Sequence, residues 1–244
     1  MSILSTCSQA VLELLFPSCC VACEKKLLQE EQLICSSCLC AIARTEHATL
    51  PDNGIDMLFA QWAAEENRTL HYMRGAAFAY YNRKRGQTLR SLIERGKFGH
   101  YPNPNIFYQL GKIAAREYVG SALLEDIDLL VPVPLHPSRI RERGFNQAEY
   151  ICRGMSEVLG IAIDTDHLIR TRNNPHQSKS EFHRRKENVK DLFSIRYPEE
   201  WKGKHILLVD DVITSGATLF ECMKQVTPIR GCRVSVFTLG WAHN

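Results

Sequence analysis

The sequence lacks long hydrophobic runs. No apolar stretch approaches the roughly 20 residues that an α-helix needs to cross a bilayer, so we expect no membrane span. The opening stretch SILSTCSQAVLELLFPSCC has no basic start and is interrupted by Glu13, which makes it a poor signal peptide. It predicts instead a short amphipathic helix that ends near Pro17, in a cytoplasmic protein.

Net charge of either sign is also small. The formal net charge is +3 at pH 7, too little to indicate a nucleic-acid partner by itself, because local clusters of charge matter more. A hydrophobic fraction of 45% and a charged fraction of 23% are ordinary for a soluble globular protein. The 244 residues suit one large domain, or a domain with a small appendage.

Cysteine, in contrast, is plentiful, with 10 residues in the chain. Most of these cysteines lie in the first forty residues, whereas Cys152, Cys222 and Cys232 are scattered through apolar surroundings. A scattered thiol of that kind is usually a small buried hydrophobe. One dense cluster in a cytoplasmic protein favours metal binding over a framework of disulfides.

The cluster reads CCVACEKKLLQEEQLICSSC and contains two hooks, Cys20-x2-Cys23 and Cys35-x2-Cys38. Two such hooks can bring four thiolates to one ion, which is how a tetrahedral structural zinc site is assembled. Cys19 is a feasible alternative to Cys20 as the first ligand, and free or disulfide-paired cysteines are the alternative to a metal. Because so short a segment buries little core, the metal would supply much of its folding free energy.

The body of the chain predicts strands that alternate with helices. We expect a short helix near residues 57–64, a strand at 75–81, and helices at 88–98 and 105–122. After these come a strand within 126–134, a basic loop at 135–147, a helix at 147–159, a strand at 205–211, a helix at 217–226 and a strand at 232–239. This alternation indicates a parallel sheet covered on both faces, whose ligands bind beyond the carboxyl ends of the strands.

One stretch, HILLVDDVITSGAT, combines features that point to a ligand. The buried strand Ile206–Val209 leads directly into Asp210 and Asp211, and small residues follow from Thr214 to Thr218. Small residues that turn into a helix leave backbone N–H groups uncovered, and these can cradle a phosphate. The adjacent carboxylates can accept hydrogen bonds from hydroxyls. A ribose 5-phosphate offers both groups side by side.

This stretch resembles the 5-phosphoribosyl-1-pyrophosphate (PRPP) motif of type I phosphoribosyltransferases. The segments VPVPLHPSRIRERGFNQAE, RTRNNPHQSKSEFHRRKENVKDLF and HILLVDDVITSGAT also occur here in the order typical of the ComF family, behind the cysteine hooks. The resemblance is strong from about Asp128 to Leu239 and weak over residues 41–74. Two departures are Ser215, where the family usually has a threonine, and Lys179-Ser180, where it usually has a leucine.

The resemblance implies an α/β fold with a type I phosphoribosyltransferase-like parallel sheet, helices on both faces, and a small zinc-binding segment in front. It divides the chain into a helix and zinc segment at 1–45, a connector at 46–74 and a phosphoribosyltransferase-like domain at 75–244. The cofactors implied are structural zinc, and magnesium bound together with PRPP.

Residue roles are carried over position by position. Asp210 and Asp211 would hold the ribose hydroxyls and magnesium. The 5-phosphate would be bound by Thr214, Ser215, Gly216, Ala217 and Thr218. The loop Pro134, Leu135, His136 and Pro137 would face the pyrophosphate, which Arg139, Arg141 and Arg143 could neutralise. A basic lid over residues 170–190 would bring Gln177, Arg184 or Arg185, and Asn188 toward the ligand.

Two functions fit these motifs. The first is a magnesium-dependent transfer of phosphoribosyl from PRPP to a nitrogen base, with release of pyrophosphate. No covalent nucleophile is needed, and the sequence shows no Ser-His-Asp or Cys-His grouping that would supply one. The second is a non-catalytic module that assists the uptake of single-stranded DNA in natural transformation, through the cations and aromatic residues of the lid.

Overall fold

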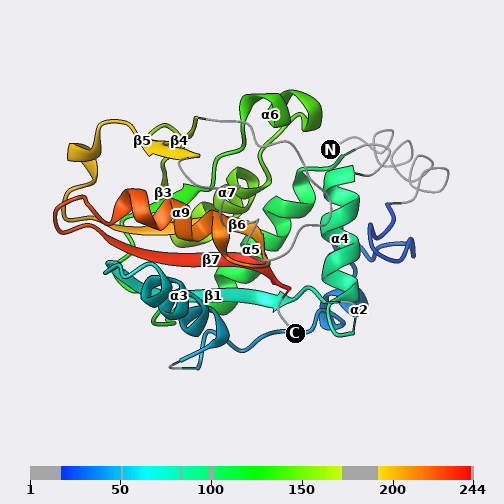
Figure 1. Ribbon diagram of the computed structural model, residues 1–244. Coiled ribbons are helices and arrows are strands. Elements are labelled where there is room, and N and C mark those ends of the chain that lie inside the picture. The colour runs from blue at the N-terminus through cyan, green and yellow to red at the C-terminus, as the bar shows by residue number, and fades with distance from the viewer. Residues whose placement is uncertain (1–17, 51, 83, 99–101, 172–191, 243–244) are drawn as a thin grey trace.

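A five-stranded parallel sheet forms the centre of the molecule, in the order β1-β7-β6-β2-β3 (Figure 1). The computed structural model describes residues 18–50, 52–82, 84–98, 102–171 and 192–242. The strands are β1 (Tyr72–Tyr80), β2 (Leu129–Pro132), β3 (Ala162–Ile163), β6 (His205–Ile213) and β7 (Arg233–Trp241). The central strands β6 and β7 are buried along most of their length, as expected for a sheet covered on both faces.

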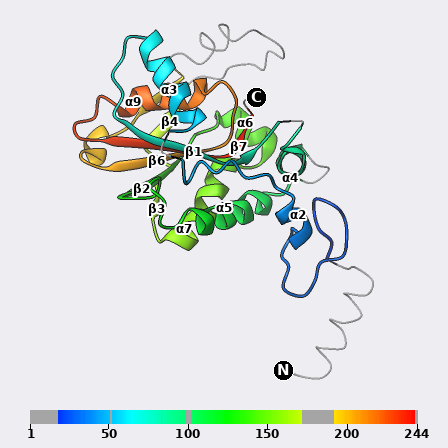
Figure 2. The same ribbon diagram turned by 90° about the horizontal axis from the view of Figure 1, so that it is seen from below.

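Helices cover the two faces of this sheet (Figure 2). One face carries α4 (Gln87–Phe98), α5 (Asn105–Tyr118) and α7 (Gln147–Leu159), and the other carries α3 (Gly54–Glu65) and α9 (Ala217–Val226). Each face has its own cluster of buried apolar side chains, with Phe107 and Ile151 in one and Trp62 and Phe220 in the other. The predicted α/β fold class is therefore confirmed.

Helices α5 and α7 approach each other backbone to backbone. Gly111 of α5 faces the carbonyl of Ile151, and Gly154 of α7 faces the carbonyl of Tyr108. A Cβ atom at either glycine would clash with the facing carbonyl oxygen. The two glycines therefore set the separation of the helices that support β2 and β6.

The cysteine segment lies beside the end of the sheet where α4 packs (Figure 1). It includes the short helix α2 (Ser36–Cys40). Arg95 of α4 donates to the carbonyl of Val21 over 2.7 Å, and Arg44 forms an ion pair of 2.7 Å with Glu117 of α5. The segment is thus fastened to both helices by charged side chains.

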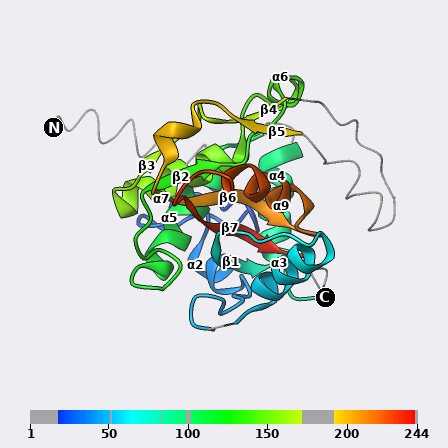
Figure 3. The same ribbon diagram turned by 60° about the vertical axis from the view of Figure 1, so that its left-hand side comes forward.

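A two-stranded antiparallel hairpin, β4 (Leu168–Arg170) and β5 (Phe193–Ile195), lies over the β3 side of the sheet near the short helix α6 (Pro137–Arg143) (Figure 3). A 3-10 helix, η1 (Pro198–Trp201), follows it and places Trp201 in the core with 0% exposure. The sequence did not predict the hairpin or η1, because the strands are only three residues long.

Several predicted elements are confirmed, and some bounds differ. The helices predicted at 147–159 and 217–226 occur as expected, but the one predicted at 105–122 ends at Tyr118. The helix near 57–64 begins earlier, at Gly54, because Asn53 and Asp56 form a capping box. The helix predicted before Pro17 lies outside the described residues.

Two expectations near the predicted site were wrong. The basic loop at 135–147 contains the helix α6 (Pro137–Arg143), which His136 caps at its start and Gly144 ends with φ of 89°. Strand β6, predicted at 205–211, continues to Ile213, since Val212 pairs with Gly240 and Ile213 with Trp241. Backbone pairing with β7 therefore carries the strand two residues past both acids.

Within the described residues, no helix has the length and hydrophobicity required to cross a membrane.

The contact between α5 and α7 yields a stability prediction. An alanine normally suits a helix better than a glycine, but Gly111→Ala would push a methyl group into the Ile151 carbonyl. We expect the free energy of unfolding to fall by about 1–3 kcal/mol, measured by urea denaturation. Arg116→Ala, at an exposed position of the same helix, is the control and should change stability little. A Gly111→Ala protein as stable as wild type would contradict this packing.

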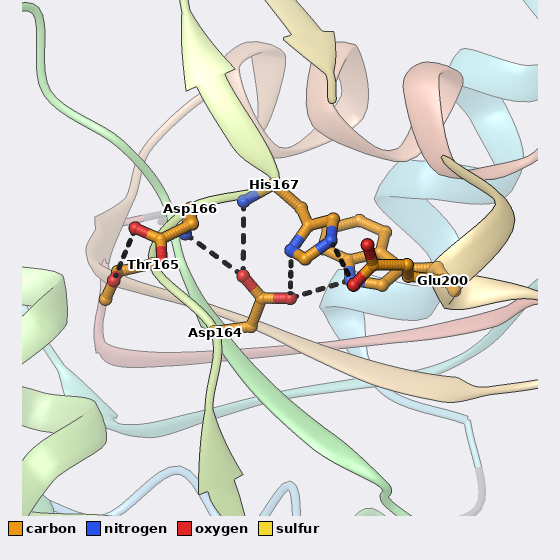
Figure 4. Close-up of polar contacts among 6 residues, drawn as sticks. Asp164, Thr165, Asp166, His167 and Glu200 are labelled. Carbon is orange, nitrogen blue, oxygen red and sulfur yellow. Dashed lines mark hydrogen bonds and ion pairs between the residues drawn. The ribbon is translucent and has the colours of Figure 1, made fainter. Parts of the chain in front are cut away.

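His167 directly precedes β4, and its ring lies between two carboxylates (Figure 4). Its Nδ1 lies 2.7 Å from Asp164 and its Nε2 lies 3.1 Å from Glu200 of η1. Trp201 also donates to Asp164, over 2.8 Å. Burial opposes a charge on His167, but the two carboxylates outweigh it and raise its pKa.

This cluster predicts a pH-dependent stability. A raised pKa means that the protonated ring stabilises the fold below about pH 6.5 and that this stabilisation is lost as pH rises through the folded pKa. The difference in melting temperature between wild type and His167→Gln should therefore be larger at pH 6 than at pH 8. Asp166 and Lys204 also border the cluster and remain in both proteins.

Glu200→Gln is the matched control, because it keeps the ring and removes one carboxylate. It should reduce the pH dependence without removing it. The same difference between wild type and His167→Gln at both pH values would show that His167 is uncharged in the folded protein.

Candidate functional site

The acid pair lies near the carboxyl end of the central strand β6. Asp211 is buried, with 8% exposure, and Asp210 is half-buried. Neighbouring residues of a strand point to opposite faces, so the two carboxylates leave the strand in different directions. Oδ1 of Asp210 accepts a hydrogen bond of 2.8 Å from the backbone N–H of Asp211.

The environment makes Asp210 a weak acid. Burial raises its pKa, and the charge of Asp211 raises it further, to about 7. The N–H of Asp211 and the cations Lys97 and Arg170 act in the opposite direction and do not overcome these effects. Asp210 is therefore partly protonated at neutral pH.

Three basic side chains from separate elements meet the pair. Lys97, in the last turn of α4, forms an ion pair with Oδ2 of Asp211. Arg143, from α6, interacts electrostatically with Asp211, and Arg170, at the end of β4, with Asp210. Burial lowers the pKa of both arginines, so these charges lie in partly desolvated surroundings.

Lys97 cannot be identified from the sequence alone. It falls within the helix predicted at 88–98, where no motif points to a role. The available signal was weak: a lysine in the last turn of an amphipathic helix, just before a glycine- and proline-rich stretch. Only the tertiary structure brings it to Asp211.

The small residues after the acids form the turn into α9. Gly216 has φ of 76°, in the left-handed region, and stands at the N-cap of the helix. A Cβ atom there would lie 2.9 Å from Leu58 and 3.2 Å from Phe59 of α3. Glycine is thus required both by conformation and by space. Ser215 and Ala217 are buried, Thr218 is half-buried and Thr214 is exposed.

The side chain of Asn146 anchors the loop after β2. Asn146 donates from Nδ2 to the carbonyl of Val133 over 3.1 Å and accepts from the N–H of Ala148 as the N-cap of α7. The residues that follow Val133 in this loop, Pro134, Leu135 and His136, are half-buried. His136 uses its Nδ1 to accept from the N–H of Ser138, so part of its hydrogen bonding serves to begin α6.

Helix α6 places the three predicted arginines on different sides of the helix. Arg139 and Arg143 are one turn apart and half-buried, whereas Arg141 is exposed. Arg143 also stacks over the ring of Phe98, with 5.2 Å from its guanidinium carbon to the ring centre. Arg139 and Arg143 thus lie on the side of the acid pair, and Arg141 does not.

The predicted contacts of the basic lid, Gln177, Arg184, Arg185 and Asn188, lie outside the described residues, as does Lys179-Ser180.

The cysteine segment gathers four sulfur atoms at one point. The thiol groups of Cys20, Cys23, Cys35 and Cys38 lie within 4.8 Å of one another. The alternative ligand Cys19 is exposed and not part of the group, and no disulfide joins the cysteines of the described residues. This group could hold a metal ion such as zinc, and four sulfur ligands would complete a tetrahedral site.

Cys20 is prepared to act as a thiolate. Its Sγ accepts hydrogen bonds from the N–H groups of Ala22, over 3.4 Å, and Cys35, over 3.3 Å. Burial opposes the charge, but backbone donors lower the pKa of Cys20 to about 6. Metal ligation requires the deprotonated sulfur, so this environment suits a metal ligand.

A cavity of about 560 Å³ lies elsewhere in the molecule. It is bordered by Tyr72, His205 and Arg233, the first residues of β1, β6 and β7. It therefore opens at the amino-terminal edge of the sheet, opposite the acid pair.

Curated proteins match much of the chain. DNA utilization protein YhgH of Escherichia coli is 27% identical over 228 residues, 91% of this chain and 96% of that protein. Competence protein F of Haemophilus influenzae is 29% identical over 158 residues, 64% of this chain and 69% of the relative. The match to YhgH of Salmonella typhi is 34% identical, but this chain spans only about half the length of that relative, 48%. No protein-family model matches the sequence.

Solved structures overlap more loosely. Glutamine PRPP amidotransferase from Bacillus subtilis gives a TM-score of 0.38 at 22% identity, over 59% of this chain and 30% of its own. Adenine phosphoribosyltransferase from Leishmania tarentolae gives 0.35 at 15% identity, over 63% and 74%. At these TM-scores neither overlap bears on function.

The resemblance drawn from the motifs is confirmed by the curated relatives and by the cysteine group. This chain is thus similar to DNA utilization protein YhgH and to Competence protein F, and it has a four-cysteine group in front of a parallel α/β sheet.

Proposed function

We propose that this chain binds PRPP at the carboxyl edge of its sheet and transfers the phosphoribosyl group to a nitrogen base, with release of pyrophosphate. The observation that carries the proposal is the acid pair Asp210 and Asp211, next to the left-handed turn at Gly216 and within reach of Arg143. The names of the relatives, DNA utilization protein and competence protein, favour a process that involves DNA.

Each part of PRPP has a matching feature in this region. The first turn of α9 offers backbone N–H groups without intrahelical partners, which suit the 5-phosphate. The carboxylates of Asp210 and Asp211 suit the ribose hydroxyls. The half-buried arginines Arg139 and Arg143 suit the pyrophosphate, because a guanidinium donates two parallel hydrogen bonds to phosphate oxygens.

The proposed reaction is a displacement at the anomeric carbon. The bond from that carbon to the pyrophosphate oxygen breaks and its electron pair leaves with pyrophosphate, while the lone pair of the acceptor nitrogen forms the new bond. Positive side chains fixed before the reaction stabilise charge as it grows on the leaving group. The carboxylates can hold the ribose against rotation and stabilise positive charge on the sugar.

Magnesium fits the oxygen ligands of this site. The carboxylates of Asp210 and Asp211, together with hydroxyl and phosphate oxygens of the substrate, are the ligand type that Mg²⁺ prefers. When bound, the ion would neutralise part of the pyrophosphate charge.

Replacing Asp210 tests the binding site with little risk to the fold. Because its pKa is about 7, Asp210→Asn resembles a form that the protein already populates, and we expect the melting temperature to change little. Binding of PRPP in the presence of magnesium, measured by calorimetry, should weaken about tenfold or more, because a charge-assisted hydrogen bond is lost. Asp166→Asn, an exposed carboxylate elsewhere, is the control and should bind as wild type does.

The test of catalysis is pyrophosphate release from PRPP in the presence of a panel of nitrogen bases. Release that depends on one base, and that Asp210→Asn reduces, supports the transferase. Binding of PRPP without release for any base would favour the second candidate, a non-catalytic module in DNA uptake. The relatives' names favour that candidate, but its predicted DNA contacts at 170–190 fall almost wholly outside the described residues.

We also propose that the four-cysteine group holds structural zinc. The purified protein should contain about one zinc per chain, because four cysteine sulfurs complete a tetrahedral site. Cys35→Ser/Cys38→Ser should lose the metal and lower the melting temperature, as measured by elemental analysis and thermal denaturation. Cys19→Ser/Cys40→Ser, at exposed neighbouring cysteines, is the matched control and should keep both. A metal-free wild type with the same fold would refute the zinc site.

A further inference from the structure

Two cations in the last turn of α4 have different surroundings. Arg95 has a side-chain exposure of 44% and fastens the cysteine segment through the carbonyl of Val21. Lys97 has a side-chain exposure of only 16% and points to Asp211, whose side chain is 12% exposed. The negative end of a helix favours cations in its last turn, but it does not require one to be buried. The low exposure of the Lys97 side chain therefore calls for a reason beyond the helix.

The end of α4 lies against α6. The guanidinium of Arg143 stacks over the ring of Phe98, and Arg143 also interacts electrostatically with Asp211. Lys97 and Arg143 thus approach the same carboxylate from two helices. Helix α6 begins directly after the loop Pro134–His136 and carries Arg139 and Arg143, which the proposed function assigns to the pyrophosphate.

The local charges leave a positive excess. Three cations, Lys97, Arg143 and Arg170, surround only two carboxylates, Asp210 and Asp211. Cations gathered in partly desolvated surroundings attract an anion more strongly than exposed ones do. A highly charged anionic ligand would neutralise this positive excess.

The contact to Asp211 also competes with the proposed ligand. Oδ2 of Asp211 is occupied by Lys97, yet the same carboxylate is needed for the ribose hydroxyls. Lysine carries a compact charge on a flexible four-carbon stem, so it can move from one oxygen to another without a change in the backbone. The helix can thus stay in place while the ammonium changes partner.

We propose that Lys97 is a pyrophosphate-binding residue of this site, with Asp211 as its counter-ion in the free protein. When PRPP binds, the ammonium leaves Asp211 for a pyrophosphate oxygen, and Asp211 becomes available to the ribose. This inference rests on the proposed function, and it adds a ligand contact from an element outside the PRPP motif.

Two probes separate the ends of the ligand: inorganic pyrophosphate and ribose 5-phosphate, each titrated by calorimetry with magnesium present. Lys97→Met keeps the length of the stem and removes the charge. It should weaken pyrophosphate binding about tenfold or more and leave ribose 5-phosphate within a few-fold of wild type. Lys97→Arg should retain most of the pyrophosphate affinity. Arg95→Met, from the same turn of α4, is the matched control and should bind both probes as wild type does.

A second comparison excludes an indirect effect. In Lys97→Met the unpaired charge of Asp211 could itself repel pyrophosphate or weaken the fold. The double variant Lys97→Met/Asp211→Asn removes both charges and is compared with Asp211→Asn alone. A direct contact predicts that the double variant binds pyrophosphate about tenfold more weakly than the single variant. Equal affinities would show that Lys97 only neutralises Asp211, and would overturn the proposal.

The outcomes also distinguish this inference from the proposed function. A wild-type protein that binds neither PRPP nor pyrophosphate would overturn both. A wild type that binds PRPP, with Lys97→Met unchanged toward pyrophosphate, would overturn the role of Lys97 and leave the proposed function standing.

Discussion

Two adjacent carboxylates near the end of a buried central strand constrain much of what surrounds them. Taking a charge out of water is costly unless an opposite charge meets it. Here the compensation comes from α4, α6 and β4, which lie far apart in the sequence and each contribute one cation. The positions of these elements around the sheet are thus linked to the charge of one acid pair. Burial and the neighbouring charge of Asp211 still raise the pKa of Asp210.

The sequence predicted what depends on neighbours along the chain. Asp210, Asp211 and Gly216 could be identified because strand, acids and turn follow one another within a single motif. The cysteine hooks could be identified for the same reason, and the structure selects Cys20 over Cys19. Helix α7 could be bounded from its apolar face and from Gly160, which ends it.

What escaped prediction depends on tertiary contacts or on short elements. Lys97 meets Asp211 only after the sheet has formed, and His167 meets Glu200 only across the hairpin. The segment of α6 predicts a loop from its sequence, because it contains three arginines and its apolar residues do not recur at helical spacing. Its end signals were nevertheless present, with a proline at its first position and Gly144 after its last. Neither segment alone indicates that Leu58 packs against Gly216.

The strand order has a consequence for synthesis of the protein. Strand β7 comes last along the sheet's part of the chain, yet it lies between β1 and β6 and pairs with both. While the ribosome is still translating the earlier strands, β1 has no neighbour in the sheet, and the apolar faces of α3 and α5 have an incomplete surface to cover. Pairing over such long sequence separations is slow and exposes unpaired edges to aggregation. A premature stop codon before residues 233–241 would therefore remove an interior strand of the sheet and leave β1 without a pairing partner in it.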